Sequence, residues 1–244
     1  WCNFLKRARG AGAPSISAPP LNLHDRLSFA STHTHLYTMT QFAEAMPHGD
    51  IQEVFPDIFF VTGTMKTVLM GAHWHFSRNM VVVRDGSNLS LINSVRLSDE
   101  GLKQLDALGT VANIVKIGSL HGLDDAFYKD RYKAKLWALP NMPHAEGVEP
   151  DQILSTDGQL PFAESSIFVF EHTKLPECIL RIDREGGILI ACDALQNWMA
   201  PDAFFSDESR QMMSEMGFFQ SANLGPVWMK VNEPKAQDFI RLNE

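Results

Sequence analysis

Apolar runs joined by turn-forming residues predict two β-hairpins. Residues 80–84 and 89–93 are largely apolar and are joined by Asp85-Gly86, a dipeptide typical of tight hairpin turns. Residues 178–183 and 187–193 repeat this pattern later in the chain. The two hairpins predict that antiparallel strands form a large part of the structure.

Capping residues and apolar spacing predict three helices. Ser98 is a typical N-cap, the leucines after it recur every three residues, and Gly109 suits the end of that helix. A second helix is expected to open at Ser206 and to close near Gly217, and residues 235–242 suit a last one.

Shorter apolar runs predict the remaining strands. They lie at residues 54–61 around a turn at Pro56, 67–70, 114–117, 134–139, 166–173 and 227–231. Residues 140–160 are expected to form a loop or flap, because three prolines interrupt any regular run there. Strands alternating with helices in this way indicate an α/β protein.

Residues 114–128 contain the most informative pattern in the chain. A β-branched run ends at Gly118-Ser119, and the residues after Gly122 suit the first turn of a helix. In open α/β folds the edge where such a strand ends is the usual place for a ligand. We therefore expect a binding site at this turn.

Three polar side chains follow that strand at helical spacing. His121, Asp124 and Asp125 stand at i, i+3 and i+4, so they share one face if the helical turn includes His121. One imidazole and two carboxylates could hold a divalent metal. Aspartates at a helix start are also common caps, and a histidine in a turn is often structural. The spacing leaves both interpretations open.

Asp193 is the second candidate for a site. It ends an almost wholly apolar strand, so its carboxylate must find a hydrogen-bond donor, a cation or water. The alternative is that Asp193 caps a helix running through Leu195 and Trp198. The strand predicted at 166–173 would deliver His172 in the same part of the fold.

Two H-x-H pairs also occur. On a strand, His33 and His35 would point to one side, and His73 and His75 would do the same with Trp74 on the other side. Together the pairs could form the metal set of another hydrolase fold, but the later chain lacks the repeated β–α units of a barrel. Both pairs are therefore interpreted as structural.

Composition and charge argue against several classes of protein. The 244 residues are 45% hydrophobic and 20% charged, which is ordinary for a globular domain, and the net charge of −8 argues against nucleic-acid binding. No uncharged apolar run approaches the roughly 18 residues that cross a membrane. Cys2, Cys178 and Cys192 form neither a disulfide framework nor a C-x-x-C site. A soluble protein of the cytoplasm or of an organelle is expected, while its oligomeric state stays open.

The first residues differ from the rest of the chain. The first 24 contain Lys6, Arg7 and Arg9 but no acidic residue, and the chain does not begin with Met. This fits a flexible leader or a targeting remnant whose upstream part is missing. We expect an irregular arm over residues 1–50 and one domain over residues 51–244.

The order of the predicted elements resembles the metallo-β-lactamase superfamily. A hairpin, a helix, a strand–turn–helix unit and a second hairpin ending in Asp193 follow one another over about residues 51–232. The resemblance implies an αββα sandwich of the metallo-β-lactamase type, with mixed sheets and helices on the outer faces. Within this superfamily, the sequence is most similar to a branch whose metal ligands are degenerate.

The ligand motifs of that superfamily are only partly present. Placing the end of H-x-H-x-D-H on Asp124-Asp125 puts its two earlier histidines on Leu120 and Gly122. His172-Thr173 keeps the opening of an H-T-P-G-H-T motif, but Pro176 stands at its ligand position. Asp193 matches the bridging aspartate. The family's late histidine has no counterpart up to Glu244, so its turn lies beyond the sequence or is absent.

The resemblance implies a reduced metal site. Its ligands would be drawn from His121, Asp124, Asp125, His172 and Asp193, with Asp124 as the catalytic residue that holds a water as base or ligand. Such an oxygen-rich set suits Mn²⁺, Fe²⁺ or Mg²⁺ better than Zn²⁺. One divalent metal (Mn, Fe or Zn), or none, is the expected cofactor.

Two functions follow, and the sequence leaves both open. The first is a metallo-β-lactamase-fold protein with an eroded metal site, which has weak or no hydrolase activity and binds a small-molecule ligand. The alternative is a single-metal hydrolase of a small ester or thioester that uses a metal-bound hydroxide. A serine nucleophile is not supported, since no G-x-S-x-G elbow occurs.

Overall fold

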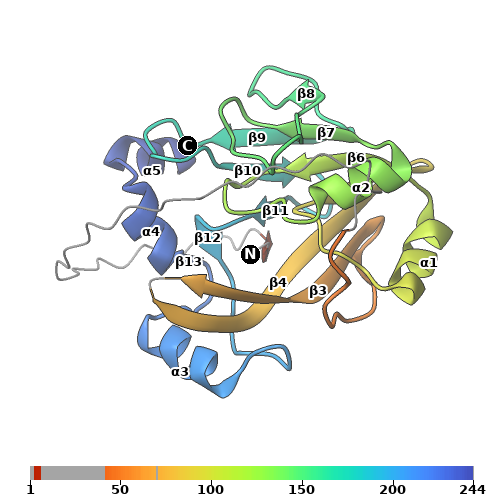
Figure 1. Cartoon of the computed structure of the whole chain (residues 1–244). Coiled ribbons are helices and arrows are strands. Elements are labelled where there is room, and N and C mark those ends of the chain that lie inside the picture. Colours follow the sequence, from red (N-terminus) through yellow and green to blue (C-terminus); the bar gives the residue numbers. More distant parts are fainter. Residues whose placement is uncertain (1–2, 7–41, 70, 244) are drawn as a thin grey trace. The chain divides into compact units, whose positions relative to one another are not determined.

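The computed structural model describes residues 3–6, 42–69 and 71–243. Its larger sheet has seven strands. In spatial order they are β2 (Gln52–Phe55), β3 (Ile58–Leu69), β4 (Ala72–Asp85), β5 (Asn88–Ile92), β6 (Thr110–Lys116), β7 (Lys135–Ala138) and β8 (Gln152–Ile153). Strands β2 to β5 pair antiparallel, and β5 to β8 pair parallel, so the sheet is mixed (Figure 1).

The second sheet is antiparallel and has four strands among the described residues. Their order is β1 (Asn3–Lys6), β11 (Ile188–Ala191), β10 (Cys178–Ile182) and β9 (Ser165–Val169). Strand β1 lies within the arm that the sequence predicted to be irregular, and it pairs with β11 at the sheet edge. Two further short strands, β12 (Leu195–Gln196) and β13 (Asn223–Leu224), pair with each other.

The main core lies between the two sheets. Alternate residues of β4, β10 and β11 belong to it, as the two-residue period of a strand requires. Val83 and Val115 of the larger sheet belong to the same buried cluster as Leu180 and Ile190 of the smaller one. Burial of apolar surface stabilises this arrangement at about 25 cal/mol per Å².

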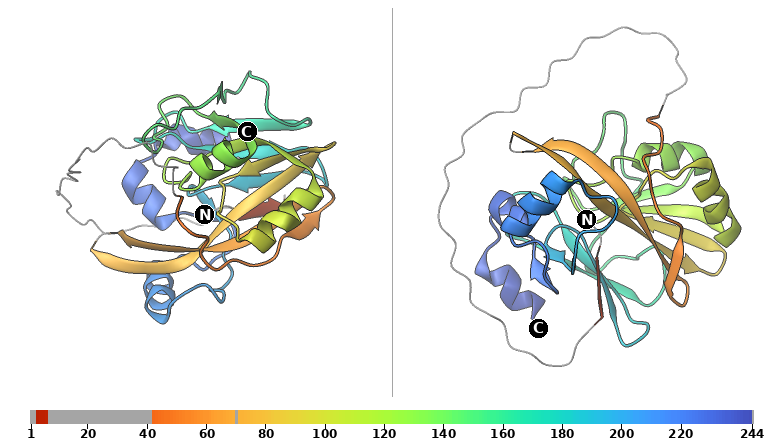
Figure 2. Two further views of the ribbon diagram at one scale, coloured as in Figure 1. Left: turned by 45° about the vertical axis from the view of Figure 1, so that its right-hand side comes forward. Right: turned by 90° about the horizontal axis from the view of Figure 1, so that it is seen from below.

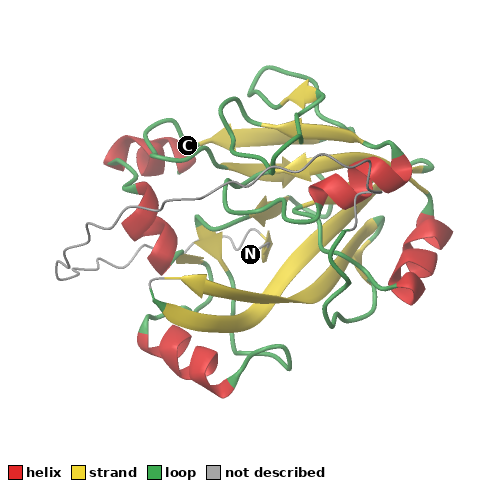
Figure 3. Ribbon diagram, in the orientation of Figure 1, coloured by secondary structure: helices red, strands yellow, loops and turns green. Residues whose placement is uncertain are grey.

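Helices cover the outer faces (Figure 3). The five helices of the described residues are α1 (Asp99–Leu108), α2 (Asp125–Tyr132), α3 (Asp207–Glu215), α4 (Pro226–Asn232) and α5 (Ala236–Leu242). Helix α2 contacts β6 and β7, and the Tyr132 hydroxyl donates to Asp106 of α1 at 2.6 Å. On the other side, Trp228 of α4 and Ile179 of β10 belong to one buried cluster, against which Phe239 of α5 packs. Figures 1 and 2 show these two helix pairs on opposite sides of the strands.

This architecture is the αββα sandwich that the resemblance implied, although only the larger sheet is mixed. Both predicted hairpins are present. Ser98 and Ser206 are the N-caps of α1 and α3, and each side-chain oxygen accepts a backbone N–H. Among these helices none is long and apolar enough to be a membrane span.

Several predicted elements were wrong. Residues 227–231 are not a strand but part of α4, because Pro226 occupies the first turn, where its fixed φ suits a helix. A five-residue apolar run cannot distinguish the two structures by itself. No helix runs through Leu195 and Trp198, because Leu195 pairs with Leu224 instead.

Two strand boundaries also differ. The apolar run from residue 67 continues β3 and is not a separate strand, and β9 ends at Val169, so His172 stands in a loop. His33 and His35 lie outside the described residues. On β4, Trp74 is buried while His73 is exposed and His75 is half-buried, as the predicted alternation requires.

Candidate functional site

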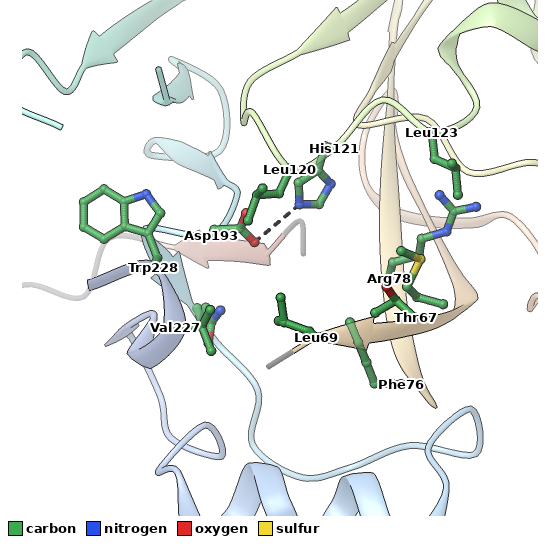
Figure 4. A pocket seen from close by; sticks show the side chains of 12 residues that line it. Thr67, Leu69, Phe76, Arg78, Leu120, His121, Leu123, Asp193, Val227 and Trp228 are labelled. Carbon is green, nitrogen blue, oxygen red and sulfur yellow. Dashed lines mark hydrogen bonds and ion pairs between the residues drawn. The ribbon is translucent and has the colours of Figure 1, made fainter. Parts of the chain in front are cut away.

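A pocket of about 220 Å³ lies where the β3–β4 hairpin, the loop after β6, the end of β11 and α4 meet (Figure 4). Its lining is mainly apolar. The lining residues are Met65, Thr67, Leu69, Phe76, Arg78, Leu120, His121, Leu123, Asp193, Gln196, Val227 and Trp228. His121 and Asp193 lie at one wall of the pocket, and Leu69 and Phe76 lie across from them.

Backbone contacts join the two sheets beside this pocket. The Cys178 N–H, at the start of β10, donates to the Ile117 carbonyl after β6 at 2.9 Å. Gly118 and Glu177 form an isolated β-bridge, and the Ser119 hydroxyl donates to the Pro176 carbonyl at 2.7 Å. These bonds place the end of β6 beside the end of β11, so residues about 70 positions apart share one rim.

Three side chains at this rim could hold a metal ion. His121, Cys192 and Asp193 each offer one donor atom, and the three atoms lie within 4.8 Å of one another. His121 Nε2 is 3.4 Å from Asp193 Oδ1. Gly118 makes the room, because a Cβ at that position would lie 2.2 Å from the Cys192 sulfur. The glycine in the predicted turn is therefore required by Cys192.

Burial controls the charge of this group. Desolvation lowers the pKa of His121 to about 4, against an opposing effect of Asp193, so the imidazole is neutral near pH 7. Behind the pocket, the buried Glu177 carboxylate accepts the Ala194 N–H at 2.5 Å. Burial and the nearby Asp193 raise the pKa of Glu177 well above its usual value. A neutral imidazole has a free nitrogen lone pair, which is the form that binds metals.

The donor types fit zinc. Zinc in proteins takes histidine nitrogen, cysteine sulfur and carboxylate oxygen, usually in tetrahedral geometry. Two light-atom ligands of one tetrahedral zinc at about 2.0–2.1 Å lie about 3.4 Å apart. The separation of His121 Nε2 from Asp193 Oδ1 has this value. Cys192 is fully buried, and its sulfur is a softer donor than the oxygen-rich set that the sequence predicted.

Asp124 and Asp125 are bound to other protein groups. Asp124 forms an ion pair with Arg78, and its Oδ2 also accepts the Arg96 N–H at 2.8 Å. Asp125 Oδ1 accepts the Ser94 hydroxyl at 2.6 Å. Both carboxylates are buried, and Asp124, although it is the N-cap of α2, makes no side-chain capping bond. They are therefore neither exposed caps nor members of the His121 group.

His172 lies elsewhere. Its Nδ1 is 3.2 Å from Asp238 of α5, and its side chain is 45% exposed. Of the five residues predicted as ligands, the structure thus brings His121 and Asp193 together and places the other three in separate contacts. Whether any of them binds metal stays a prediction.

Sequence reasoning missed four residues of this region. Cys192 belongs to no disulfide framework or C-x-x-C motif, although it precedes Asp193 directly. Glu177 directly follows Pro176, which stands at the ligand position of the hairpin motif, and this proximity was a usable signal. Nothing in the local sequence marked Arg78 or Gln196, because their place in the pocket depends on chain pairing.

Neither a protein-family model nor a curated protein matches the chain. Solved structures of metallo-β-lactamases are similar to it. The DIM-1 enzyme exposed to ceftazidime is 12% identical, with 57% of this chain and 67% of that chain covered and a TM-score of 0.45. For the Pontibacter korlensis metallo-β-lactamase these values are 9%, 74%, 95% and 0.45. For the mono-zinc form of FIM-1 from Pseudomonas aeruginosa they are 13%, 57%, 66% and 0.41.

In fold the described part of the protein is an αββα sandwich, with two packed sheets and helices on the outer faces. This is the class that the resemblance of the sequence implied. The chain spans about two thirds of the length of the DIM-1 and FIM-1 enzymes.

Proposed function

We propose that the protein is a hydrolase that binds a single zinc ion through His121, Cys192 and Asp193. The proposal rests on the meeting of these three donors within 4.8 Å beside a pocket. A zinc ion held by three protein ligands supplies Lewis acidity and lowers the pKa of bound water. The substrate would be a small carbonyl compound, such as an ester or thioester, with an apolar body that fits the lining.

The chain's own residues have defined parts in this proposal. His121, neutral through burial, offers a nitrogen lone pair, and Asp193 offers a carboxylate oxygen on the same wall. Glu177 holds the Ala194 N–H and thereby fixes the backbone that carries Asp193. Leu69, Phe76 and Val227 exclude water from the ligand's apolar part.

One observation favours a non-catalytic pocket as the second candidate. Asp124, predicted to be the base, is bound to Arg78 and to the Arg96 N–H. The Asp124 Oδ2 is therefore already used in contacts within the protein. The protein would then bind a ligand without turning it over.

Metal analysis of the purified protein tests the proposal. After incubation with zinc and removal of excess, the wild type should hold about one zinc per chain, the occupancy of one closed donor set. Cys192→Ala and Asp193→Ala should each lower zinc content severely, whereas His172→Ala should keep it. Equal zinc in the wild type and both variants would exclude the site.

Activity separates the two candidates. Hydrolysis of a short p-nitrophenyl ester should depend on zinc and fail in Cys192→Ala. A zinc-loaded wild type with no turnover of esters or thioesters would favour the binding pocket and not the hydrolase.

A further inference from the structure

His48 connects two elements, one through its backbone and one through its side chain. Its backbone forms an isolated β-bridge with Gly63 of β3, and the neighbouring Gly49 N–H donates to the Thr62 carbonyl at 2.8 Å. Its half-buried imidazole contacts the start of α1, 50 residues later in the chain. His48 therefore joins an edge of the larger sheet to a helix.

Both ring nitrogens of His48 have a partner whose role is fixed. Nε2 lies 2.8 Å from the backbone nitrogen of Ser98, which can only donate a hydrogen. Nδ1 lies 2.7 Å from the Gly49 carbonyl oxygen, which can only accept one. Nε2 must therefore carry the lone pair and Nδ1 the hydrogen, because a neutral imidazole has one donor and one acceptor nitrogen. The two contacts require the neutral ring in this one tautomer.

The imidazole also completes the N-terminal cap of α1. Ser98 is the N-cap, and its hydroxyl oxygen accepts the Gly101 N–H at 3.3 Å. In a capping box, a Glu or Gln at the position of Gly101 reaches back to the N-cap N–H. Gly101 has no side chain, and a Cβ there would lie 2.7 Å from His48 Cε1. The His48 ring thus occupies the place of that side chain and makes its hydrogen bond.

Charged groups around this contact act in both directions. Those of α1 and of the segments beside it are Asp50, Arg96, Asp99, Glu100 and Lys103, whereas residues 62–64 of β3 carry none. The acids favour a cation, while the basic residues and the N-terminal end of α1 disfavour one. A protonated Nε2 could still donate to the Ser98 hydroxyl, 2.9 Å away, but not to the Ser98 N–H. Protonation of the ring therefore breaks the bond to that N–H.

We propose that His48 is a pH-dependent latch between β3 and α1. The latch is closed while the imidazole is neutral, and it opens when the imidazole takes up a proton and releases the Ser98 N–H. Histidine ordinarily changes its charge between about pH 5 and pH 8. The latch therefore stabilises the start of α1 near pH 7.5 and loses this contribution as the pH falls toward 5. It does not depend on the proposed zinc site or on hydrolysis.

Nitrogen-15 NMR of the full chain with labelled histidine tests the closed state. At pH 7.5 the His48 signals, assigned from through-bond correlations, should show a protonated Nδ1 and an unprotonated Nε2. A protonated Nε2 at this pH would overturn the proposal. This measurement uses the wild type alone, so it decides even where a variant fails to fold.

Amide hydrogen exchange at Ser98 tests the opening. Corrected for the intrinsic rate, the wild-type protection should fall about 3- to 10-fold from pH 7.5 to pH 5, the loss of one hydrogen bond. In His48→Gln, Oε1 stands as many bonds from the backbone as Nε2 does and stays a neutral acceptor. Protection in this variant should change less than about 2-fold, because its acceptor does not take up a proton in this range.

Two further variants make the exchange test specific. His73→Gln, at an exposed position of β4, removes a histidine elsewhere and should behave like the wild type. His48→Ala lacks the acceptor at every pH and should show low Ser98 protection already at pH 7.5. The proposal is overturned by wild-type protection that does not change with pH, by an equal loss in His48→Gln, or by full protection in His48→Ala.

Discussion

Two groups of polar side chains lie close together in sequence but differ in their surroundings. Asp124 and Asp125, at the start of α2, are bound by an arginine and a serine hydroxyl. His121, three residues earlier, lies with Cys192 and Asp193 at the strand ends, and its imidazole pairs with the Asp193 carboxylate. Both groups lie at the same end of β6, and all of their side chains are buried except that of His121, which is partly buried.

The comparison shows that polar residues close together in one motif can be bound by different parts of the fold. A buried carboxylate is stable only when a cation or several donors compensate for lost hydration. For Asp124 this partner is Arg78 of β4, which is 46 residues away in the chain. The spacing of acidic residues in a motif therefore identifies candidates, while the packing of other strands decides which partner each carboxylate binds.

The largest effect is expected when Arg78, the cation that pairs with Asp124, is removed. Arg78→Met leaves the Asp124 carboxylate buried without its charge partner, and we expect a loss of about 3–5 kcal/mol in the free energy of unfolding. Urea denaturation measures it. Adding Asp124→Asn should recover part of the loss, because the unpaired charge disappears.

A matched control is the ion pair of Arg84 with Asp57, whose side chains are 32% and 47% exposed. Arg84→Met should cost no more than about 1 kcal/mol, as expected for a solvated pair. A loss as small for Arg78→Met would show that Asp124 does not need its arginine.

The second test disturbs the strand-end group. Gly118→Ala places a methyl group 2.2 Å from the Cys192 sulfur, and overpacking of this kind costs about 1–3 kcal/mol. The variant should also lose zinc, because Cys192 must move. The double variant Gly118→Ala/Cys192→Ala should recover most of the stability but not the metal.

Gly49→Ala is the control for the loss of a glycine, since its nearest atom would lie at 3.7 Å. Additive effects of Gly118→Ala and Cys192→Ala in a double-mutant cycle would contradict the proposed contact.

The smallest effect concerns pH. Burial raises the pKa of Asp125 in the folded protein, so its contribution to stability is fully present below the unfolded value of 3.8 and is lost as pH rises through the folded value. Asp125→Asn has no titratable group at this position and therefore does not lose this stability as the pH rises. Its stability relative to the wild type should therefore increase from pH 4 to pH 7 in urea denaturation series.

Asp130→Asn, on the exposed face of the same helix, controls for the removed charge. The difference in the free energy of unfolding between Asp125→Asn and the wild type could instead stay constant over this pH range. That result would show that the Asp125 carboxyl has the same pKa in the folded and in the unfolded protein. Histidine titration is common to all three proteins and cancels in the comparison.

Local patterns were sufficient for most of the secondary structure. The hairpins at 80–93 and 178–193 and the helices capped by Ser98 and Ser206 follow from turn chemistry, capping and apolar period, which act between residues close in sequence. The order of these elements resembled the metallo-β-lactamase superfamily, and that resemblance implied the αββα class. Patterns failed at residues 227–231 and at Leu195, where a short run is compatible with two structures and tertiary pairing selects one.

The candidate site was determined differently. The sequence identified His121 and Asp193, because polar residues at the ends of buried strands require partners. Only the tertiary structure decided that Cys192 joins them, that Arg78 binds Asp124 and that Gln196 faces the pocket. These contacts cross between strands and sheets far apart in the chain, and their geometry depends on how the two sheets pack, which no local pattern encodes.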